Sequence, residues 1–387
     1  MKIAIIGAGS VGSALTRVLL TQDIVSTIVI LDRNGNALDE IKSAHSDHPS
    51  ISRLRTFRVN IEEYSSIVTL LKGLDVIISA LPYKFNTELT RIAIDNGCHF
   101  LDLGGSDQVY EDQLQLHELA SRNRSFVLPN CGLAPGLLNI IAYNGYKKFD
   151  KVSSIKIMSG GLPVNPQPPL NHHLSFSAVG FLSEHLPPVL AVENGKPVHL
   201  EPLSGLEPVQ FRTRPELDTL EMFNTGGHIS TLAKTLDRSV DNLCYKTIRH
   251  HGNHDIMKAL ITLGFADDRI IDVASSMTYR DLLIRKLRQQ LPENLPDIVL
   301  AKVVIEGTMD GQKQTNNYEL VYEYNSEDGH SAIMTCTAVP TALIALMAAK
   351  GKIKGEPGVS APEQVINAES LFQQLEDWGI SISESSE

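Results

Sequence analysis

The chain has 387 residues, of which 42% are hydrophobic and 20% are charged, a composition typical of folded proteins and not of disordered ones. Lys and Arg number 34 against 45 Asp and Glu, which gives a formal net charge of −11. Such an acidic surface repels phosphate backbones and anionic lipid, so it argues against nucleic-acid and membrane-surface partners. The length predicts two or three domains.

The cysteines and the apolar runs indicate the cellular compartment in which the protein works. Cys98, Cys131, Cys244 and Cys336 lie far apart and form no CxxC pair, which argues against a disulfide scaffold, a zinc ribbon or a redox motif. The first residues lack the apolar run of a signal peptide. The longest apolar stretch, 341–349, is shorter than the ~20 residues that span a bilayer. We therefore expect a soluble, cytoplasmic protein.

The first 130 residues alternate between strand and helix patterns. Apolar, β-branched runs predict strands at 2–6, 27–31, 53–59, 75–81, 99–103 and 125–128. Helical spacing of apolar residues predicts helices at 12–20, 62–71, 86–96 and 108–122. This alternation predicts an α/β fold, a Rossmann-type doubly wound parallel sheet with helices on both faces.

The pattern changes after Pro129. A proline-bearing segment, 160–173, is expected to form a stiff extended loop. Alternating runs of the antiparallel type follow at 189–200, 209–213, 301–306 and 318–324, with hairpin turns at Gly195 and Gly311. We expect an inserted α+β catalytic domain over 131–335. An apolar helix over 340–349 is expected to pack on the first domain, which then comprises 1–130 plus 336–387.

The sequence from Gly7 to Gly12 is a GxGxxG motif between the first strand and the first helix. Gly7 allows the tight turn, Gly9 lets the backbone approach a pyrophosphate, and Gly12 lets helix and strand pack closely. The N–H groups at the helix start, including those of Ser10 and Val11, bind the anion. The bland alternative is that the glycines only shape a turn. The strand and helix on either side favour a dinucleotide site.

Asp32 ends the second strand, 20 residues after the last glycine of the motif. A carboxylate there accepts hydrogen bonds from the adenosine ribose hydroxyls and repels a 2′-phosphate, which favours NAD over NADP as cofactor. Arg33 would serve a phosphate only if Asp32 turned away. Ala80, Leu81 and Pro82 follow the fourth strand, and they either line the nicotinamide or ribose or form an ordinary turn.

Ligands of doubly wound sheets lie beyond the carboxyl ends of the strands. Lys84, Asp102 and Asn130 occupy such positions after strands four, five and six. Asp102 belongs to an apolar strand, and an unpaired buried carboxylate is costly. This residue therefore either serves chemistry or binds a backbone turn.

Two stretches of the second domain, 221–228 and 246–254, carry many polar groups beside glycines. Arg249 is either a bidentate partner for a substrate carboxylate or a member of a surface ion pair. The histidines of the second stretch show no established metal spacing, so no metal site is predicted. His172 and His173 either line a cleft or are ordinary exposed loop residues.

Together these segments resemble the saccharopine dehydrogenase superfamily, and within it most closely the lysine 6-dehydrogenase group. The proline-bearing segment discriminates best. The resemblance rests on residues 7–12, 132–136, 160–163, 165–166, 168–169, 176–178, 193–196, 201–207, 221–225 and 246–249.

The resemblance implies a homodimer or larger oligomer and a small amino-acid or polyamine substrate. It also implies NAD-dependent oxidative deamination of the ε-amine of L-lysine, which yields ammonia and 2-aminoadipate 6-semialdehyde. A base must deprotonate the substrate amine, and Asp102, His254 and Lys84 are the candidates.

In this scheme four residues are expected to bind the substrate. Arg249 would hold the α-carboxylate, Glu221 or Thr225 would orient the amine, and Asn130 would contact the substrate from the end of the sixth strand. One alternative is a saccharopine or carboxynorspermidine dehydrogenase that acts on a secondary amine. Another is a dinucleotide-sensing protein without turnover, because fold alone does not establish activity.

Overall fold

The structure is a computed structural model that describes residues 1–174, 177–186, 188–217, 219–292, 296–326 and 329–387. The chain divides into two compact units. Unit 1 comprises Met1–Asn144, Ser230–Thr235 and Met334–Gly379. Unit 2 comprises Gly145–Ile229, Leu236–Ile333 and Ile380–Glu387.

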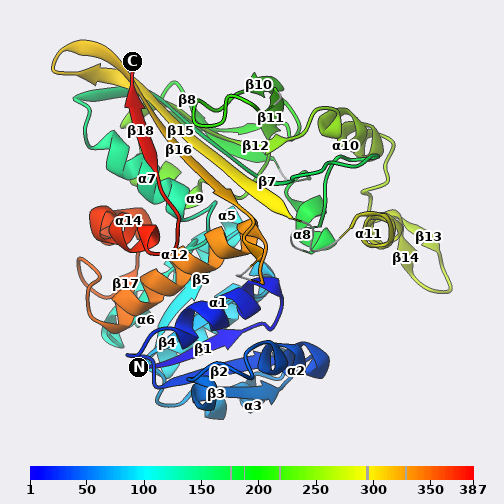
Figure 1. Ribbon diagram of the computed structural model, residues 1–387, viewed down its shortest axis with the longest axis vertical. Coiled ribbons are helices and arrows are strands. Elements are labelled where there is room, and N and C mark those ends of the chain that lie inside the picture. The colour runs from blue at the N-terminus through cyan, green and yellow to red at the C-terminus, as the bar shows by residue number, and fades with distance from the viewer. Residues whose placement is uncertain (175–176, 187, 218, 293–295, 327–328) are drawn as a thin grey trace. The chain divides into compact units, whose positions relative to one another are not determined.

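Unit 1 is built on a seven-stranded sheet in the order β17-β6-β5-β4-β1-β2-β3. Every neighbouring pair is parallel, and helices flank the strands (Figure 1). This is the predicted Rossmann-type fold. The strands are β1 (Lys2–Ile6), β2 (Thr27–Asp32), β3 (Leu54–Arg58), β4 (Val76–Ser79), β5 (His99–Asp102), β6 (Phe126–Leu128) and β17 (Gly358–Val359).

Over residues 1–130 the helices of unit 1 differ from the sequence prediction in two places, and α7, α9, α13 and α14 farther along the chain were not predicted. The predicted helix 108–122 is two helices, α5 and α6. Helix α2 was missed because only Leu38 and Ile41 of its ten residues are buried, which leaves a weak apolar period. The helices are α1 (Ser10–Leu20), α2 (Gly35–Ala44), α3 (Tyr64–Leu71), α4 (Asn86–Asp95), α5 (Asp107–Leu114), α6 (His117–Arg122), α7 (Leu137–Tyr146, whose end extends into unit 2), α9 (Ser230–Thr235), α13 (Pro362–Val365) and α14 (Ala368–Glu376).

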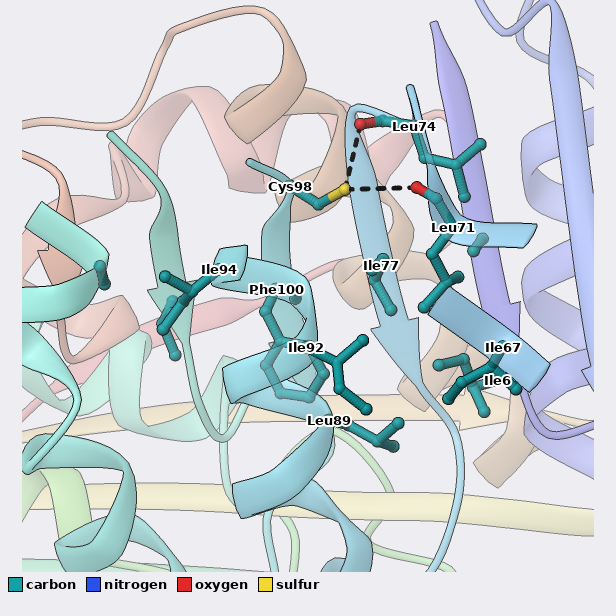
Figure 2. Close-up of a cluster of buried hydrophobic side chains, with 14 of the residues drawn as sticks. Ile6, Ile67, Leu71, Leu74, Ile77, Leu89, Ile92, Ile94, Cys98 and Phe100 are labelled. Atoms are coloured by element: carbon teal, nitrogen blue, oxygen red, sulfur yellow. Dashed lines mark hydrogen bonds between the residues drawn. The ribbon is translucent and has the colours of Figure 1, made fainter. Parts of the chain in front are cut away.

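One face of the unit 1 sheet packs on an apolar cluster that includes Ile6, Ile77, Leu89 and Phe100 (Figure 2). The Cys98 thiol lies at its edge and donates to the backbone oxygen of Leu74 at 3.2 Å. Burial raises the pKa of Cys98 to about 11. This cysteine is therefore a packed core residue and not a reactive thiol.

Unit 2 holds a mixed nine-stranded sheet in the order β10-β11-β12-β7-β15-β16-β18, with the β8–β9 hairpin beside β12. Only β7 and β12 pair in parallel among these neighbours. The strands are β7 (Lys151–Pro163), β8 (Val189–Glu193), β9 (Lys196–Leu200), β10 (Glu207–Val209), β11 (Leu220–Asn224), β12 (Val240–Arg249), β15 (Asp297–Met309), β16 (Gln312–Glu323) and β18 (Ser383–Ser386).

Three helices of unit 2 pack around a second apolar core. They are α8 (Ala178–Ser183), α10 (Asn253–Thr262) and α11 (Tyr279–Gln290). Between α10 and α11 the chain makes a small hairpin of β13 (Ile270–Asp272) and β14 (Met277–Thr278), which extends away from both helices (Figure 1).

Several expectations for the second half were wrong. The expected loop begins later, because Gly160 and Gly161 belong to β7. A side chain at Gly160 would put its Cβ 2.3 Å from the Ile248 carbonyl oxygen, so the glycine lets β12 approach closely. The strand expected over 209–213 ends at Val209. The turns at Gly195 and Gly311 were placed correctly, and both glycines have positive φ, of 72° and 75°.

The unit boundaries also differ from the expected domain boundaries. Residues 131–144 belong to unit 1, where the Thr341 hydroxyl donates to the Cys131 backbone oxygen at 2.8 Å. The C-terminal residues 380–387 belong to unit 2, because β18 pairs antiparallel with β16. The chain therefore returns to unit 2 at its end.

Helix α12 (Ala332–Ala349) begins eight residues before the expected helix and continues through Pro340. Its first N–H groups, from Ala332 and Ile333, donate to the Asp297 carboxylate at 2.6 and 3.0 Å, which caps the helix start. By length and composition α12 passes for a membrane span, but 83% of it is buried inside the protein, as expected for a core helix.

Candidate functional site

The phosphate-loop glycines of unit 1 lie where the chain has no room for side chains. A Cβ at Gly7, whose φ is +114°, would lie 2.7 Å from the Ala80 oxygen, and one at Gly12 would lie 1.9 Å from the Gly7 oxygen. By contrast, a Cβ at Gly9 would meet nothing within 4 Å. Gly9 therefore borders an open space at the start of α1, a cradle that fits a pyrophosphate group.

Asp32 ties the end of β2 to this loop. Its Oδ2 accepts a hydrogen bond from the Ala8 N–H at 2.7 Å, and its Oδ1 accepts one from the Asn34 N–H at 2.7 Å. Arg33, the next residue, is exposed. Together with Arg58 it lines an open pocket at the ends of β2 and β3.

The residues after β4 lie beside the same loop. The Ala80 N–H donates to the Ile6 oxygen at 2.8 Å, and a Cβ at Gly7 would lie 3.2 Å from a methyl group of Leu81. Pro82 and Lys84 are exposed, and the Lys84 ammonium lies 4.7 Å from the ring centre of Phe85. The geometry fits a bound dinucleotide, which would supply a hydride acceptor when bound.

Such a cofactor would be held by the glycine motif, the start of α1, the end of β2 and the residues that follow β4. The residues are Gly7, Gly9, Ser10, Val11, Gly12, Asp32, Arg33, Ala80, Leu81 and Pro82.

Asp102 stands at the end of β5 and is only 1% exposed. Its Oδ1 accepts hydrogen bonds from the N–H groups of Gly104 and Asn130 at 2.8 and 3.0 Å, and its Oδ2 accepts one from the Gln113 side chain at 2.7 Å. Burial raises the pKa of Asp102, and these three hydrogen bonds counteract the rise. Of the two roles considered for Asp102, the contacts fit the binding of a backbone turn.

Asn130 shares this structural setting. It has a positive φ of 62°, and its side-chain amide donates to the Ser230 hydroxyl at 3.0 Å. Both residues belong to unit 1. Asn130 therefore joins the end of β6 to the start of α9.

Glu221 and His254 of unit 2 hold the start of α10. The two Glu221 carboxylate oxygens accept hydrogen bonds from the N–H groups of His254, at 2.7 Å, and Gly252, at 3.1 Å. The His254 ring has partners at both nitrogens: Nε2 lies 2.8 Å from the Leu203 oxygen, and Nδ1 lies 2.8 Å from an Asp255 carboxylate oxygen. Both ring nitrogens of His254 therefore already have hydrogen-bond partners within unit 2.

Arg249 ends β12 and is 4% exposed. One terminal nitrogen pairs with the Glu184 carboxylate of α8's C-terminal end at 2.5 Å, and the other donates to the Ile248 oxygen at 2.9 Å. Its Nε is buried without a hydrogen-bond partner. The expected alternative, a surface ion pair, is therefore wrong, because the pair is buried.

His172 and His173 lie close to this ion pair. Neither is an exposed loop residue: they are 2% and 0% exposed, and all four ring nitrogens are buried without partners. The His172 ring stacks on Phe181 at 4.7 Å between centroids. The guanidinium of Arg249 lies 5.9 Å from the centre of the same Phe181 ring.

Burial and the Arg249 charge together lower the pKa values of these rings. The pKa of His172 falls well below its usual range, and that of His173 falls to about 4, in both cases first because of burial and then because of Arg249. His185, whose Nδ1 bonds the Phe181 backbone oxygen at 2.8 Å, has its pKa lowered to about 3 by the same two causes. The three rings are therefore neutral at physiological pH.

Thr225 belongs to the same neighbourhood. It follows β11, is buried, and has a hydroxyl without a hydrogen-bond partner. The next residue, Gly226, donates its N–H to the backbone oxygen of Glu184 at 3.0 Å. We call the group formed by His172, His173, Glu184, His185, Thr225 and Arg249 the Arg249 cluster.

Sequence reasoning found part of this cluster. Arg249 and Thr225 were predicted as substrate-binding residues, and His172 and His173 were considered. Glu184 and His185 were missed, and so was Phe181, because a short helix of mixed composition carries no recognisable pattern. Within the described residues, no group of His, Cys, Asp and Glu is arranged to hold a metal ion.

Comparisons with known proteins give a consistent result. The family model described as the saccharopine dehydrogenase NADP binding domain matches residues 3–128. The model described as the saccharopine dehydrogenase C-terminal domain matches residues 132–380.

Curated relatives are distant. Carboxyaminopropylagmatine dehydrogenase of Synechocystis sp. is 24% identical over 98% of this chain and 96% of that protein. The NADP(+), L-glutamate-forming saccharopine dehydrogenase of Saccharomyces cerevisiae is 22% identical over 99% of this chain and 98% of that protein. Alpha-aminoadipic semialdehyde synthase of Arabidopsis thaliana is 23% identical, but the match spans 24% of its length. The match to the Schizosaccharomyces pombe saccharopine dehydrogenase spans 49% of that protein.

Among solved structures, the apo saccharopine dehydrogenase of Saccharomyces cerevisiae matches with a TM-score of 0.80 and 19% identity, over 100% of this chain and 99% of that one. At this identity the likeness shows the fold alone. The two family models, however, cover most of the sequence in two consecutive blocks. The chain therefore belongs to the saccharopine dehydrogenase family.

Proposed function

We propose that this protein is a nicotinamide-dependent dehydrogenase that oxidises a carbon–nitrogen bond of an amino acid. The proposed reaction is oxidative deamination of the ε-amine of L-lysine. The observation that carries the proposal is the Arg249 cluster, in which a buried cation lies among polar groups that lack partners. The names of the relatives, which include saccharopine dehydrogenase and aminoadipic semialdehyde synthase, support substrates of this chemical class.

The Arg249 cluster suits the head group of an amino acid. The free Nε–H of Arg249 and the unpartnered Thr225 hydroxyl are donors that a carboxylate satisfies. Glu184 supplies the opposite charge beside Arg249, which suits an α-ammonium group. Glu221, which was expected to orient the reacting amine, already holds the start of α10 with its carboxylate.

A neutral histidine of the cluster is the proposed base. His173 is neutral and has an unpartnered ring, whereas the Asp102 carboxylate and both nitrogens of the His254 ring already have hydrogen-bond partners. Burial first, and then the Arg249 cation, lower the pKa of His173. A substrate carboxylate at Arg249 would offset the second of these causes and so raise that pKa. In the proposed reaction the ε-amine would lose a proton to His173, and the ε-carbon would give a hydride to the oxidised nicotinamide that a bound dinucleotide supplies. Water would then convert the imine to the aldehyde and ammonia.

The test is a substrate panel with the purified protein. Reduced nicotinamide is measured with L-lysine, saccharopine and carboxynorspermidine, each with NAD and with NADP. We expect turnover with L-lysine, a reduction in kcat of ~10²-fold or more for His173→Gln, and a raised KM for Arg249→Met. The control is Lys84→Ala, at an exposed residue that the proposed scheme does not use, and it should keep the wild-type kcat.

Other outcomes of the panel overturn the proposal. Turnover only with saccharopine or carboxynorspermidine would assign a secondary-amine substrate, as the names of the full-length relatives suggest for those proteins. Binding of dinucleotide with no turnover of any amine would favour a sensing role.

A further inference from the structure

Helix α9 is a short segment of unit 1 that lies, in the sequence, between two segments of unit 2. Within unit 1 it packs on α5 and α13. Polar contacts hold it there. The Ser230 hydroxyl accepts a hydrogen bond from the Asn130 side-chain amide at 3.0 Å, and Lys234 forms an ion pair with Glu111 of α5 at 2.6 Å. The position of α9 in unit 1 therefore depends on a few polar side chains.

A buried carboxylate, Glu363 of α13, makes two further contacts with α9. Glu363 is 3% exposed, and its oxygens accept hydrogen bonds from the hydroxyls of Thr235, at 3.1 Å, and Thr231, at 3.2 Å. The Thr231 hydroxyl also accepts a hydrogen bond from the Asn139 side-chain amide of α7 at 3.2 Å. We call Glu363, Thr231, Thr235 and Asn139 the Glu363 cluster. This cluster ties α9 to both α13 and α7.

The Glu363 cluster has no positive charge of its own. In the part of the chain that the structure describes, no Lys, Arg or His forms an ion pair with Glu363, and Lys234 pairs with Glu111 instead. The side-chain oxygen of Asn139 is buried without a hydrogen-bond partner. A proton on Glu363 removes a buried charge and adds a donor to a cluster that has an unused acceptor.

The titratable groups around this cluster come from three places. Tyr110 and Glu111 belong to α5, Lys234 belongs to α9, and Cys131 follows β6. Burial is the first cause that raises the pKa of both the Tyr110 hydroxyl and the Cys131 thiol, so both stay protonated near pH 7. Lys234 and Glu111 compensate each other. Burial raises the pKa of Glu363 to about 7, although its own backbone N–H and the two threonine hydroxyls oppose the rise.

We propose that Glu363 is a proton-controlled latch for α9, which holds the helix in its place in unit 1 when protonated and releases it when ionised. The ionised carboxylate is buried without a counter-charge, whereas undocking of α9 exposes it to water. Ionisation therefore favours the undocked helix, and the latch opens as the pH rises. The inference is independent of the proposed reaction, because neither the nicotinamide nor the amine takes part in it.

The experiment is amide hydrogen exchange of the full-length protein at pH 6 and pH 8. Exchange is measured by mass spectrometry over α9 and corrected for the intrinsic rate at each pH. The carboxyl has a pKa of 4.5 when exposed and about 7 in the cluster, which makes undocking about tenfold more favourable at pH 8 than at pH 6. We expect this loss of protection in the wild type and none in Glu363→Gln, whose side chain has the same shape but stays neutral.

The matched control is Glu356→Gln. Glu356 is an exposed carboxylate of unit 1, so its loss should leave the tenfold ratio unchanged. Thr235→Val removes a hydroxyl that stabilises the ionised carboxylate, so protection should be lost at a higher pH than in the wild type. Equal protection of wild-type α9 at the two pH values, or a loss that persists in Glu363→Gln, would overturn the inference. An unchanged midpoint in Thr235→Val would do so as well.

Discussion

Asp102 in unit 1 and His173 in unit 2 are both buried polar residues, yet their partners differ. Three hydrogen-bond donors surround the Asp102 carboxylate, whereas neither nitrogen of the His173 ring has a partner. A buried polar group without a partner costs roughly 1–3 kcal/mol. A ligand that supplied the missing partner would offset this cost. The contacts of Asp102 fit a structural tie, and the unpartnered ring of His173 supports its proposed place in a binding site.

Burial and pKa do not separate these two residues. Burial shifts both of them toward the neutral form, raising the pKa of Asp102 and lowering that of His173. Perturbed pKa values point to functional sites only as a tendency, because structural networks produce them too. The hydrogen-bond partners distinguish Asp102 from His173. Substitutions that remove one group at a time test this distinction.

The largest effect is expected from Asp102→Ala. The substitution leaves the N–H groups of Gly104 and Asn130 and the Gln113 amide without an acceptor in a buried place. We expect a loss of about 4 kcal/mol in the free energy of unfolding, measured by urea denaturation. Asp102→Asn keeps one acceptor oxygen and should lose less. An unchanged urea midpoint in Asp102→Ala, with activity abolished, would instead make Asp102 a catalytic residue.

The sequence predicted unit 1 well because its signals are local. The strand Lys2–Ile6, the glycines from Gly7 to Gly12 and Asp32 follow one another within a short βαβ unit. Gly7 and Gly12 have the steric reasons that the spacing already implies, and Gly9 borders open space at the start of α1. The long strand β7 was missed because an expected proline-rich loop covered its end, and glycines within it weaken the strand pattern.

The Arg249 cluster was predictable only in pieces, because its members come from separate segments. His172 and His173 precede α8, Glu184 ends it, and Arg249 ends β12. A sequence shows that each can ionise, but pairing and burial depend on which strands lie side by side. The same limit applies to the open pocket at the ends of β2 and β3. Arg58, one of its lining residues, lies beside Asp32 only through the register of these two strands.

Glu184→Gln tests whether the cation of the Arg249 cluster depends on its partner. The substitution leaves Arg249 buried without a counter-charge, which costs about 3 kcal/mol in the free energy of unfolding. The double variant Glu184→Gln with Arg249→Met removes the charge as well and should recover much of this loss. If the single variant is as stable as the wild type, or the double variant is less stable than the single one, the buried pair does not have the proposed role.

The smallest effect on stability is expected from His173→Gln at pH 7.5, because no hydrogen bond within the described structure is lost. We expect a change within ~1 kcal/mol in the free energy of unfolding. The pH dependence should nevertheless change. The pKa of His173 is about 4 in the folded protein, against 6.5 for an ordinary histidine, so the unfolded chain binds more protons between these values.

The wild type therefore loses stability as the pH falls below 6.5 and through about 4. His173→Gln removes this contribution, which amounts to about 2 kcal/mol at pH 5. Urea denaturation at pH 7.5 and pH 5 should show the variant gaining on the wild type at the lower pH. The control is His199→Gln, at an exposed position of β9, which should change the stability equally at the two pH values. If His173→Gln and the wild type lost the same stability between the two pH values, the His173 ring would be solvated. His173 would then not be the buried base that is proposed for the Arg249 cluster.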